Sequence, residues 1–144
     1  MKKYPSISIV TPTWNSPLPL FERVLRTLKN QEYPKNLLEH IVIDAGSVNN
    51  TIELAKKYGC DITVRSDLKI QEQVRASLGI KKAKNDIILM LQSDNIPTSK
   101  NWLKEMVQPF LDNKKVFCTF SAYNSYEKNI LYFFWKLLNY IIIF

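Results

Sequence analysis

Histidine and cysteine are scarce in this sequence, and their scarcity excludes several kinds of site. The 144 residues include one histidine, His40, and two cysteines, Cys60 and Cys118, which stand far apart. Multi-histidine metal sites are therefore excluded, and no C-x-x-C pair is present for zinc or redox chemistry. A Ser-His-Asp triad is disfavoured, because His40 directly precedes an apolar stretch and is expected to be structural or exposed. The cysteines are expected to be reduced thiols in a cytosolic protein.

Glycine is also scarce, with three residues in the chain. Neither G-x-G-x-x-G nor G-x-x-x-x-G-K-[ST] is present, so dinucleotide oxidoreductases and P-loop NTPases are disfavoured. A nucleotidyltransferase would normally bring a glycine-rich loop near its N-terminus, and TPTWNSPLP (residues 11–19) contains no glycine. A phosphate group bound here would be held by a metal ion rather than by a glycine-rich loop.

The chain has no block of like charges, although its net charge is +7. A modest basic excess suits an anionic partner, such as a nucleotide phosphate or an anionic membrane surface. Nucleic acid is not expected as a partner, because the basic residues are scattered rather than clustered.

Long hydrophobic runs are absent as well. The first ten residues carry two lysines but no long apolar region, so no signal peptide is expected. Residues 129–144 are apolar and aromatic but are shorter than the ~20 residues that a bilayer span needs. Residues at helical spacing in this stretch predict a helix: they are Leu131, Phe134, Trp135 and Leu138. We expect this helix to pack on missing or partner structure, with shallow membrane association and an exposed remainder of a larger fold as alternatives.

Strand-like and helix-like patterns alternate along the chain. Strands are expected at residues 6–11, 40–44, 61–65, 87–91 and 116–121. Helices are expected from residue 20, over 51–58 with Gly59 as a C-terminal cap, over 71–83, and after an N-cap at Thr98 or Ser99. Such alternation predicts an α/β domain over residues 1–121, with a doubly wound, mostly parallel sheet flanked by helices. A mixed α+β fold is the alternative.

Polar residues follow the strands at the carboxyl edge of this sheet, where open parallel sheets bind ligands. They are Thr11, Thr13, Asn15, Asp44, Arg65, Asp67, Gln92, Ser93, Asp94 and Asn95. Asp44 and Asp94 end two different core strands, and we expect Asp44 to stand exposed at the rim of a pocket rather than buried. Carboxylates at strand ends can hold a base or a ribose, or ligate a hard divalent cation that bridges a diphosphate.

Three segments, in order and with the usual spacing, resemble the nucleotide-sugar-binding half of a family-two glycosyltransferase of GT-A fold, which is Rossmann-like. They are ISIVTPTWNSPLPLFERVLRTLKNQEYP, EHIVIDAGSVNNTIELAKKYG and VRASLGIKKAKNDIILMLQSDNIPTSKNWLKEMVQPF. The resemblance covers about residues 5–112. It implies transfer of a sugar from a nucleoside diphosphate sugar to an acceptor hydroxyl, with inversion, in polysaccharide or glycolipid assembly.

The resemblance also implies roles for individual residues. The positions that the family uses for the nucleotide correspond to Pro12, Thr13, Asn15, Asp44, Arg75 and Ser93. Among them, the loop of residues 12–15 would surround the base and ribose, Asp44 would contact the base, and Arg75 would lie near the diphosphate. Asp94 corresponds to the last acid of the D-x-D-type motif, which contacts the diphosphate and a Mg²⁺ or Mn²⁺ ion.

Each of these residues also has a plainer interpretation. Asp44 could cap or close the turn that follows it, and Asp94 could belong to turn chemistry alone. Arg75 falls within a predicted helix, where a solvated surface charge is common. Thr13 could be an ordinary loop residue, and Trp14 could pack or border the base.

The sequence departs from the family pattern at three places. Ala45 stands where many relatives have a second acid, and Gln92 stands where many have an aspartate. No residue can be assigned as the catalytic base, because neither Asp112 nor Glu127 matches a family position. We therefore expect a truncated chain, a donor-binding half in which residues 122–144 begin the acceptor-binding half. A non-catalytic nucleotide-sugar-binding module is the alternative. The expected acceptor is a saccharide or a lipid-linked molecule, and the expected location is the cytoplasm, with the inner face of the membrane as an alternative.

Overall fold

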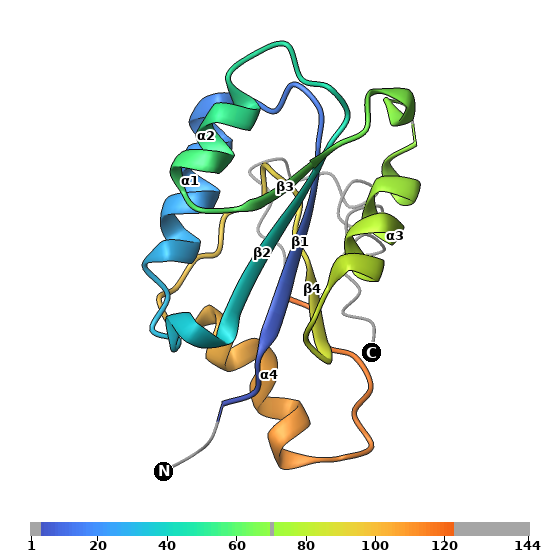
Figure 1. Cartoon of the computed structure of the whole chain (residues 1–144). Helices are drawn as coiled ribbons and strands as arrows, with labels where there is room; N and C mark the ends of the chain where they lie inside the picture. Colours follow the sequence, from blue (N-terminus) through green and yellow to red (C-terminus); the bar gives the residue numbers. More distant parts are fainter. Residues whose placement is uncertain (1–3, 70, 123–144) are drawn as a thin grey trace.

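The computed structural model describes residues 4–69 and 71–122, and its centre is one parallel sheet. The strands are β1 (Ile7–Thr13), β2 (Leu38–Asp44), β3 (Asp61–Val64) and β4 (Ile87–Met90). They lie in the order β3-β2-β1-β4, and every neighbouring pair is parallel (Figure 1). The predicted α/β fold with a parallel sheet is thereby confirmed. The strand order reverses beside β1, because the chain first builds β2 and β3 on one side and then places β4 on the other.

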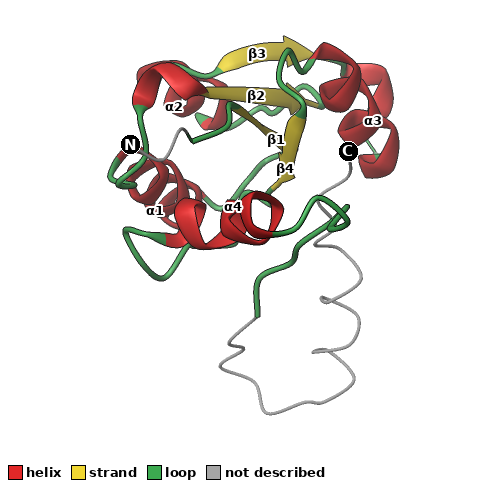
Figure 2. Ribbon diagram, turned by 90° about the horizontal axis from the view of Figure 1, so that it is seen from below, coloured by secondary structure: helices red, strands yellow, loops and turns green. Residues whose placement is uncertain are grey.

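Helices cover both faces of the sheet, as expected for a doubly wound domain. They are α1 (Leu18–Lys29), α2 (Thr51–Lys57), α3 (Glu72–Lys82) and α4 (Trp102–Asp112). The views in Figures 1 and 2 place α1, α2 and α4 on one face and α3 on the opposite face. Short 3₁₀ helices at Lys35–Leu37 and Ser66–Leu68 lie in the connections before β2 and α3.

The alternation of side chains along each strand decides which helix layer each residue meets. On β1, Ile7 and Ile9 face the layer of α1 and α4, whereas Val10 faces α3. On β2, Val42 packs with α1 and α2, whereas Ile41 and Ile43 face α3. Because the period of a strand is two residues, this parity extends to the polar residues that end the strands.

The helix α3 lies unusually close to the centre of the sheet. A β-carbon added at Gly79 would come within 2.2 Å of Val10 Cγ1, so only glycine allows this approach. The contact fixes the height of α3 over β1 and β2, and with it the position of the residues in the first turns of α3.

Most predicted elements are confirmed, with boundaries shifted by one to three residues. Gly59 follows α2 with φ +79°, as expected for a glycine beyond a helix C-terminus. The N-cap of α4 is Asn101 rather than Thr98 or Ser99. Among the described residues, no helix is both long enough and apolar enough to cross a membrane.

The strand predicted at residues 116–121 is wrong. These residues have no regular secondary structure and run beside α4, where Thr119 Oγ1 donates to Met106 O (2.9 Å) and Trp102 Nε1 donates to Ser121 Oγ (3.1 Å). A strand needs a neighbour to satisfy its backbone groups, and this segment pairs neither with β4, whose outer edge is open, nor with any other strand of the described sheet. The helix predicted within 122–144 lies outside the described residues, apart from Ala122.

Candidate functional site

A cavity of about 240 Å³ opens at the carboxyl ends of β1 and β4, where the strand order reverses. This is the place where open α/β sheets bind ligands. Its lining comes from the end of β1, the loops after β1 and β4, and the first turns of α3: Pro12, Trp14, Ser16, Pro17, Glu72, Arg75, Gln92, Ser93 and Asp94. We call it the switch-point cavity.

The switch-point cavity brings together four of the residues predicted from the sequence, namely Pro12, Arg75, Ser93 and Asp94. The other three, Thr13, Asn15 and Asp44, do not line it. Strand parity explains this division. Pro12 shares the α3 side of β1 with Val10, whereas Thr13 and Asp44 continue the opposite face.

Arg75 is a buried cation at the wall of the cavity. Its side chain is 4% exposed, and its Nη1 donates to the carbonyl oxygens of Leu68 and Lys69, the latter at 2.9 Å. The Nε atom is buried without a hydrogen-bond partner, and no carboxylate within the described residues forms an ion pair with this guanidinium. A buried charge without a counter-ion is costly, so the arrangement favours an anion in the cavity. The interpretation of Arg75 as a solvated surface charge is wrong.

Asp94 is presented to solvent by the loop after β4. Its side chain is exposed and lines the cavity, and within residues 4–69 and 71–122 no hydrogen bond or ion pair occupies its oxygens. The adjacent Ser93 accepts a hydrogen bond from Ser16 Oγ (2.8 Å), which ties this loop to the loop after β1. Asn95 is buried, and its Oδ1 has no partner among the described residues. The loop therefore leaves the Asp94 carboxylate available to a ligand.

The expectation that Asp44 stands exposed at a rim is wrong. Its side chain is 0% exposed, and its oxygens accept hydrogen bonds from Thr13 Oγ1 (2.7 Å), Gly46 N (2.8 Å), and the N and Oγ of Ser47 (2.7 and 2.6 Å). These donors satisfy the carboxylate internally and close the turn after β2. The apolar strand implied that the Asp44 carboxylate is buried. It is buried, and the hydrogen bonds compensate the free-energy cost of burying the charge.

Asn15 joins the turn after β2 to the loop after β1. Its backbone adopts φ +46°, its N–H donates to Ser47 Oγ (2.7 Å), and its Oδ1 accepts from Val48 N (2.9 Å). Asparagine tolerates this left-handed conformation better than most residues. Together with the hydrogen bond of Thr13 to Asp44, the contact fixes the loop that leads into the cavity wall at Trp14 and Ser16.

Sequence reasoning did not single out Glu72, which also lines the switch-point cavity. Glu72 is in the first turn of α3, and its Oε1 accepts a hydrogen bond from Gln92 Nε2 (2.6 Å). In the sequence it is one of several exposed polar residues at a helix start, and no local signal separates it from the others. Trp14, considered at the sequence level as a residue that could border the base, is 45% exposed beside the cavity.

The donor atoms around the cavity suit a hard divalent cation. Carboxylate, hydroxyl and amide oxygens are available from Asp94, Glu72, Ser93 and Gln92, and neither histidine nor cysteine lines the cavity. No cluster of three or more acidic, histidine or cysteine ligands occurs in the part of the chain that the structure describes. The residues fit Mg²⁺ or Mn²⁺ provided that most of its ligands are phosphate oxygens and water, as is usual for Mg²⁺.

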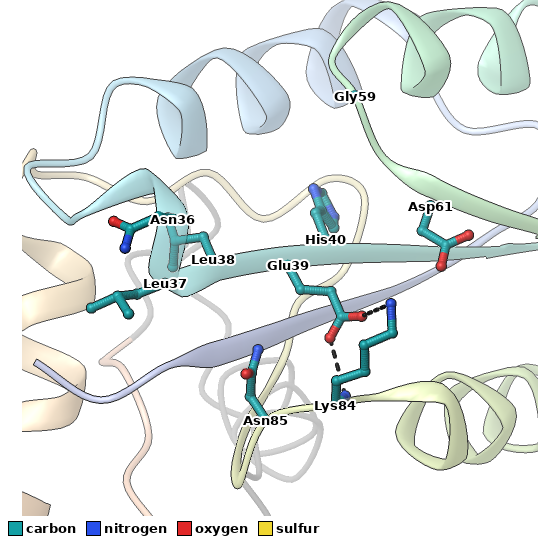
Figure 3. A pocket seen from close by; sticks show the side chains of 9 residues that line it. All are labelled: Asn36, Leu37, Leu38, Glu39, His40, Gly59, Asp61, Lys84 and Asn85. Atoms are coloured by element: carbon teal, nitrogen blue, oxygen red, sulfur yellow. Dashed lines mark hydrogen bonds and ion pairs between the residues drawn. The ribbon is translucent and has the colours of Figure 1, made fainter.

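A second hollow, of about 390 Å³, lies near the amino-terminal half of β2, the start of β3 and the segment before β4 (Figure 3). Two of its charged groups form an ion pair: Glu39 points toward Lys84, whose Nζ lies 3.6 Å from Glu39 Oε1. Glu39 Oε2 accepts hydrogen bonds from Ser8 Oγ (2.7 Å) and Lys84 N (3.1 Å). His40 lines this hollow, and burial lowers its pKa to about 4, so the ring is neutral near pH 7. Its ring nitrogens lie 2.9 Å from Thr11 Oγ1 and 3.4 Å from Cys60 Sγ, which agrees with the expected structural role.

Comparisons with known proteins point to one family. The model of the family "Glycosyl transferase family 2" matches residues 8–141. The chain is 28% identical over 106 residues to the poly(ribitol-phosphate) beta-N-acetylglucosaminyltransferase TarS of Staphylococcus aureus (strain Mu50 / ATCC 700699), a match that covers 68% of this chain and 18% of TarS. It is 26% identical over 108 residues to the glycosyltransferase AglE of Haloferax volcanii, covering 72% of this chain and 34% of AglE. The chain thus spans well under half of either relative.

A solved structure of similar fold has a nucleotide sugar bound. The mannosyltransferase PcManGT of Pyrobaculum calidifontis, in complex with GDP-Man and Mn²⁺, superposes with a TM-score of 0.68 at 21% identity, over 83% of this chain and 37% of that one. At this level of identity the likeness supports the fold alone, and it agrees with the GT-A arrangement of sheet and helices described above.

Proposed function

The chain belongs to glycosyl transferase family 2, and on that premise we propose that the switch-point cavity binds a nucleoside diphosphate sugar together with a divalent cation. The protein would transfer the sugar to an acceptor hydroxyl in the assembly of a polysaccharide or glycolipid. The observation that carries the proposal is the buried, unpaired guanidinium of Arg75 in the same cavity as the exposed carboxylate of Asp94. The guanidinium of Arg75 favours an anion and the carboxylate of Asp94 favours a cation. A diphosphate with a bound cation supplies both charges.

The residues divide into those that would touch the donor and those that would shape its loops. In the proposal Arg75 donates to the diphosphate, Asp94 holds Mg²⁺ or Mn²⁺, and Ser93 lies beside them. Pro12 and Trp14 border the base or ribose from the loop after β1. Thr13, Asn15 and Asp44 would act on the nucleotide chiefly through this loop, because their side chains are engaged with one another and with the turn after β2.

In the proposed reaction, the bond between the sugar's anomeric carbon and the diphosphate oxygen breaks, and a bond from that carbon to the acceptor oxygen forms with inversion. A bound divalent cation would stabilise the negative charge on the departing nucleoside diphosphate. Arg75 would hold the diphosphate in place during this step. The acceptor's proton must pass to a base. Asp112 is no candidate from this cavity, since it is at the end of α4, accepts from Gln108 Nε2 (2.6 Å), and does not line it.

Relatives and structural neighbours support the donor class. TarS of Staphylococcus aureus has a crystal structure of its residues 1–349 in complex with UDP-GlcNAc, and PcManGT has a solved structure in complex with GDP-Man and Mn²⁺. We extend to this chain only what these share, a sugar linked to a nucleoside diphosphate. The acceptor in the proposal is a saccharide or a lipid-linked molecule, met in the cytoplasm or at the inner face of a membrane through peripheral contact.

Calorimetry tests the donor site directly. The 144-residue protein is titrated with UDP, GDP and their sugars, with and without Mn²⁺. We expect one of the two nucleotide series to bind, and to bind more tightly when Mn²⁺ is present. A folded sample that binds none of these ligands under either condition would contradict the proposal.

A second candidate function is a non-catalytic nucleotide-sugar-binding module. The observation in its favour is that Glu72 and Asp94 are the only carboxylates that line the cavity within the described residues, and both fit the cation better than the acceptor. Such a module would bind nucleotide but transfer no sugar to any acceptor pool. Transfer catalysed by this chain alone would reject it.

A further inference from the structure

The carboxylate of Glu72 lies beside Gln92 at the wall of the switch-point cavity. Residue 92 is an amide, so the loop after β4 contributes one acid to this cavity, Asp94. Gln92 Nε2 donates a hydrogen bond to Glu72 Oε1 at 2.6 Å, and both residues line the switch-point cavity with Asp94. A second acid, from the first turn of α3, thus joins Asp94 at the cavity. The Gln92 side chain holds it there.

The position of Glu72 relative to Arg75 follows from helix geometry. Residues three apart lie on the same face of a helix, so Glu72 and Arg75 face the cavity together, one turn apart. They are not within ion-pair distance, because the guanidinium is buried toward the carbonyl groups of Leu68 and Lys69. Glu72 is exposed, and apart from Gln92 no described residue bonds to its carboxylate. One carboxylate oxygen therefore remains available to a ligand.

The charges of the residues that line the cavity indicate which ligands it can bind. Arg75 contributes +1, and Glu72 and Asp94 contribute −1 each, so the lining carries −1 in total. A nucleoside diphosphate sugar adds a charge of about −2, since each of its two phosphates is ionised near pH 7. Two carboxylates beside that diphosphate would repel it unless a cation lay between them. The unpaired Arg75 points to the anion, and the second carboxylate points to a cation that joins the anion to the protein.

Resting on the donor site proposed above, we propose that Glu72 is a second carboxylate of the cation site and, with Asp94, holds the divalent ion that bridges to the diphosphate. Glu72 supplies from α3 a carboxylate that the amide of Gln92 does not supply. Glu72 binds only the cation, whereas Arg75 binds the diphosphate. Loss of the Glu72 charge should consequently weaken cation binding while leaving metal-free nucleotide binding intact or slightly tighter.

The test measures Mn²⁺ directly. The concentration of free Mn²⁺ is measured by electron paramagnetic resonance in titrations of the full chain, with UDP and in parallel with GDP. The affinity for each nucleotide without metal is measured by calorimetry. The variants are Glu72→Gln and, as a matched control, Glu53→Gln, an exposed acid in the first turn of α2. A double variant, Glu72→Gln with Gln92→Asp, returns an acid to the loop after β4. Circular dichroism checks that each variant is folded.

We expect Glu72→Gln to weaken nucleotide-dependent Mn²⁺ binding roughly tenfold or more, with metal-free affinity unchanged or higher. Glu53→Gln should behave as the parent protein, and the double variant should recover most of the Mn²⁺ affinity. Mn²⁺ affinity within twofold of the parent protein in Glu72→Gln would overturn the inference, as would an equal loss with and without metal. A double variant no better than Glu72→Gln would overturn the replacement of residue 92 by Glu72. If the parent protein binds neither nucleotide, the donor site itself fails, and that result is distinct from all of these.

Discussion

Two aspartates end two parallel strands of the same sheet, yet their environments are opposite. Asp44 after β2 is fully buried, and four hydrogen bonds from three neighbouring residues satisfy its carboxylate. Asp94 after β4 is exposed in the switch-point cavity and is unbonded within the described structure. The comparison shows that a carboxylate at a strand end is a structural anchor when the turn closes on it, and a ligand site when the turn leaves it open.

Backbone geometry produces this difference. The turn after β2 reverses at once, because Gly46 adopts φ +79° and directs its own N–H and that of Ser47 at the Asp44 carboxylate. In the loop after β4, Asn95 N instead donates to Gln92 O (3.3 Å), and the Asp94 side chain points outward. Strand parity adds to the effect, since Gln92 continues the α3 face of β4, where the cavity lies.

Removing the two carboxylates one at a time should separate stability from ligand binding. Asp44→Ala leaves several buried donors unpaired, so we expect a loss of about 4 kcal/mol in the free energy of unfolding. Asp94→Ala removes an exposed group and should change that free energy by less than ~0.5 kcal/mol. Urea unfolding followed by circular dichroism measures both. Equal losses in the two variants would remove the distinction.

Loss of Asp94 should have little effect on stability but a large effect on ligand binding. We expect Asp94→Ala to weaken Mn²⁺-dependent nucleotide binding roughly 100-fold, because the cation loses a protein ligand. Metal-free binding should change little. Calorimetry with and without Mn²⁺ checks this, and unchanged Mn²⁺-dependent affinity would remove Asp94 from the site.

Arg75 supplies the cavity with charge of the opposite sign, and its loss should be independent of metal. Arg75→Met keeps much of the side-chain volume, so nucleotide affinity should fall roughly 30-fold with and without Mn²⁺, as for lost hydrogen bonds to a charged group. Stability should stay the same or rise, because an uncompensated buried charge is removed. The exposed Arg26→Met is the matched control. A loss seen only with Mn²⁺ would contradict direct contact with the diphosphate.

The turn after β2 can be tested through its glycine, with the smallest expected effect. Gly46 and Gly59 both have φ +79°, but a β-carbon at Gly46 would lie 2.9 Å from Ser66 Cβ, whereas at Gly59 it would meet nothing within 4 Å. We expect Gly59→Ala to cost about 1 kcal/mol of unfolding free energy from backbone strain, and Gly46→Ala about 1 kcal/mol more from the added contact. Denaturant unfolding measures the difference. Identical costs would show that the turn yields to the added methyl group.

Much of the fold could be predicted from local patterns. Apolar periodicity located the four strands and four helices of the structure, and Gly59 marked the end of α2. The same method predicted a strand at 116–121, where an apolar and β-branched composition is present but the segment pairs with no strand of the described sheet. A strand is a pairing between segments, and composition alone does not specify the partner.

The candidate site could be predicted only in part, because contacts between separate segments also decide its geometry. Asp94 was found from its place at the end of a strand, and Arg75 through the family resemblance. The burial of Arg75 against two carbonyl groups could not be read from a helical pattern with one apolar face. Glu72 gave no local signal, because its partner Gln92 is 20 residues away. The exposure of Asp44 was predicted wrongly. Three of its four hydrogen bonds come from Gly46 and Ser47 in the turn that follows it, and the fourth comes from Thr13, 31 residues away on the neighbouring strand.

By itself, the sequence determined the alternation of strands and helices, the parallel sheet, the family, and the gathering of polar residues at the carboxyl edge. These follow from the period of the apolar residues and from turn residues that act over a few positions. Tertiary structure alone decided which of the polar residues face the cavity and which form hydrogen bonds within the fold. The physical reason is that a carboxylate or guanidinium is satisfied by whatever groups the folded chain brings within about 3 Å of it. Some of those groups, such as Thr13 for Asp44 and Gln92 for Glu72, come from distant parts of the sequence.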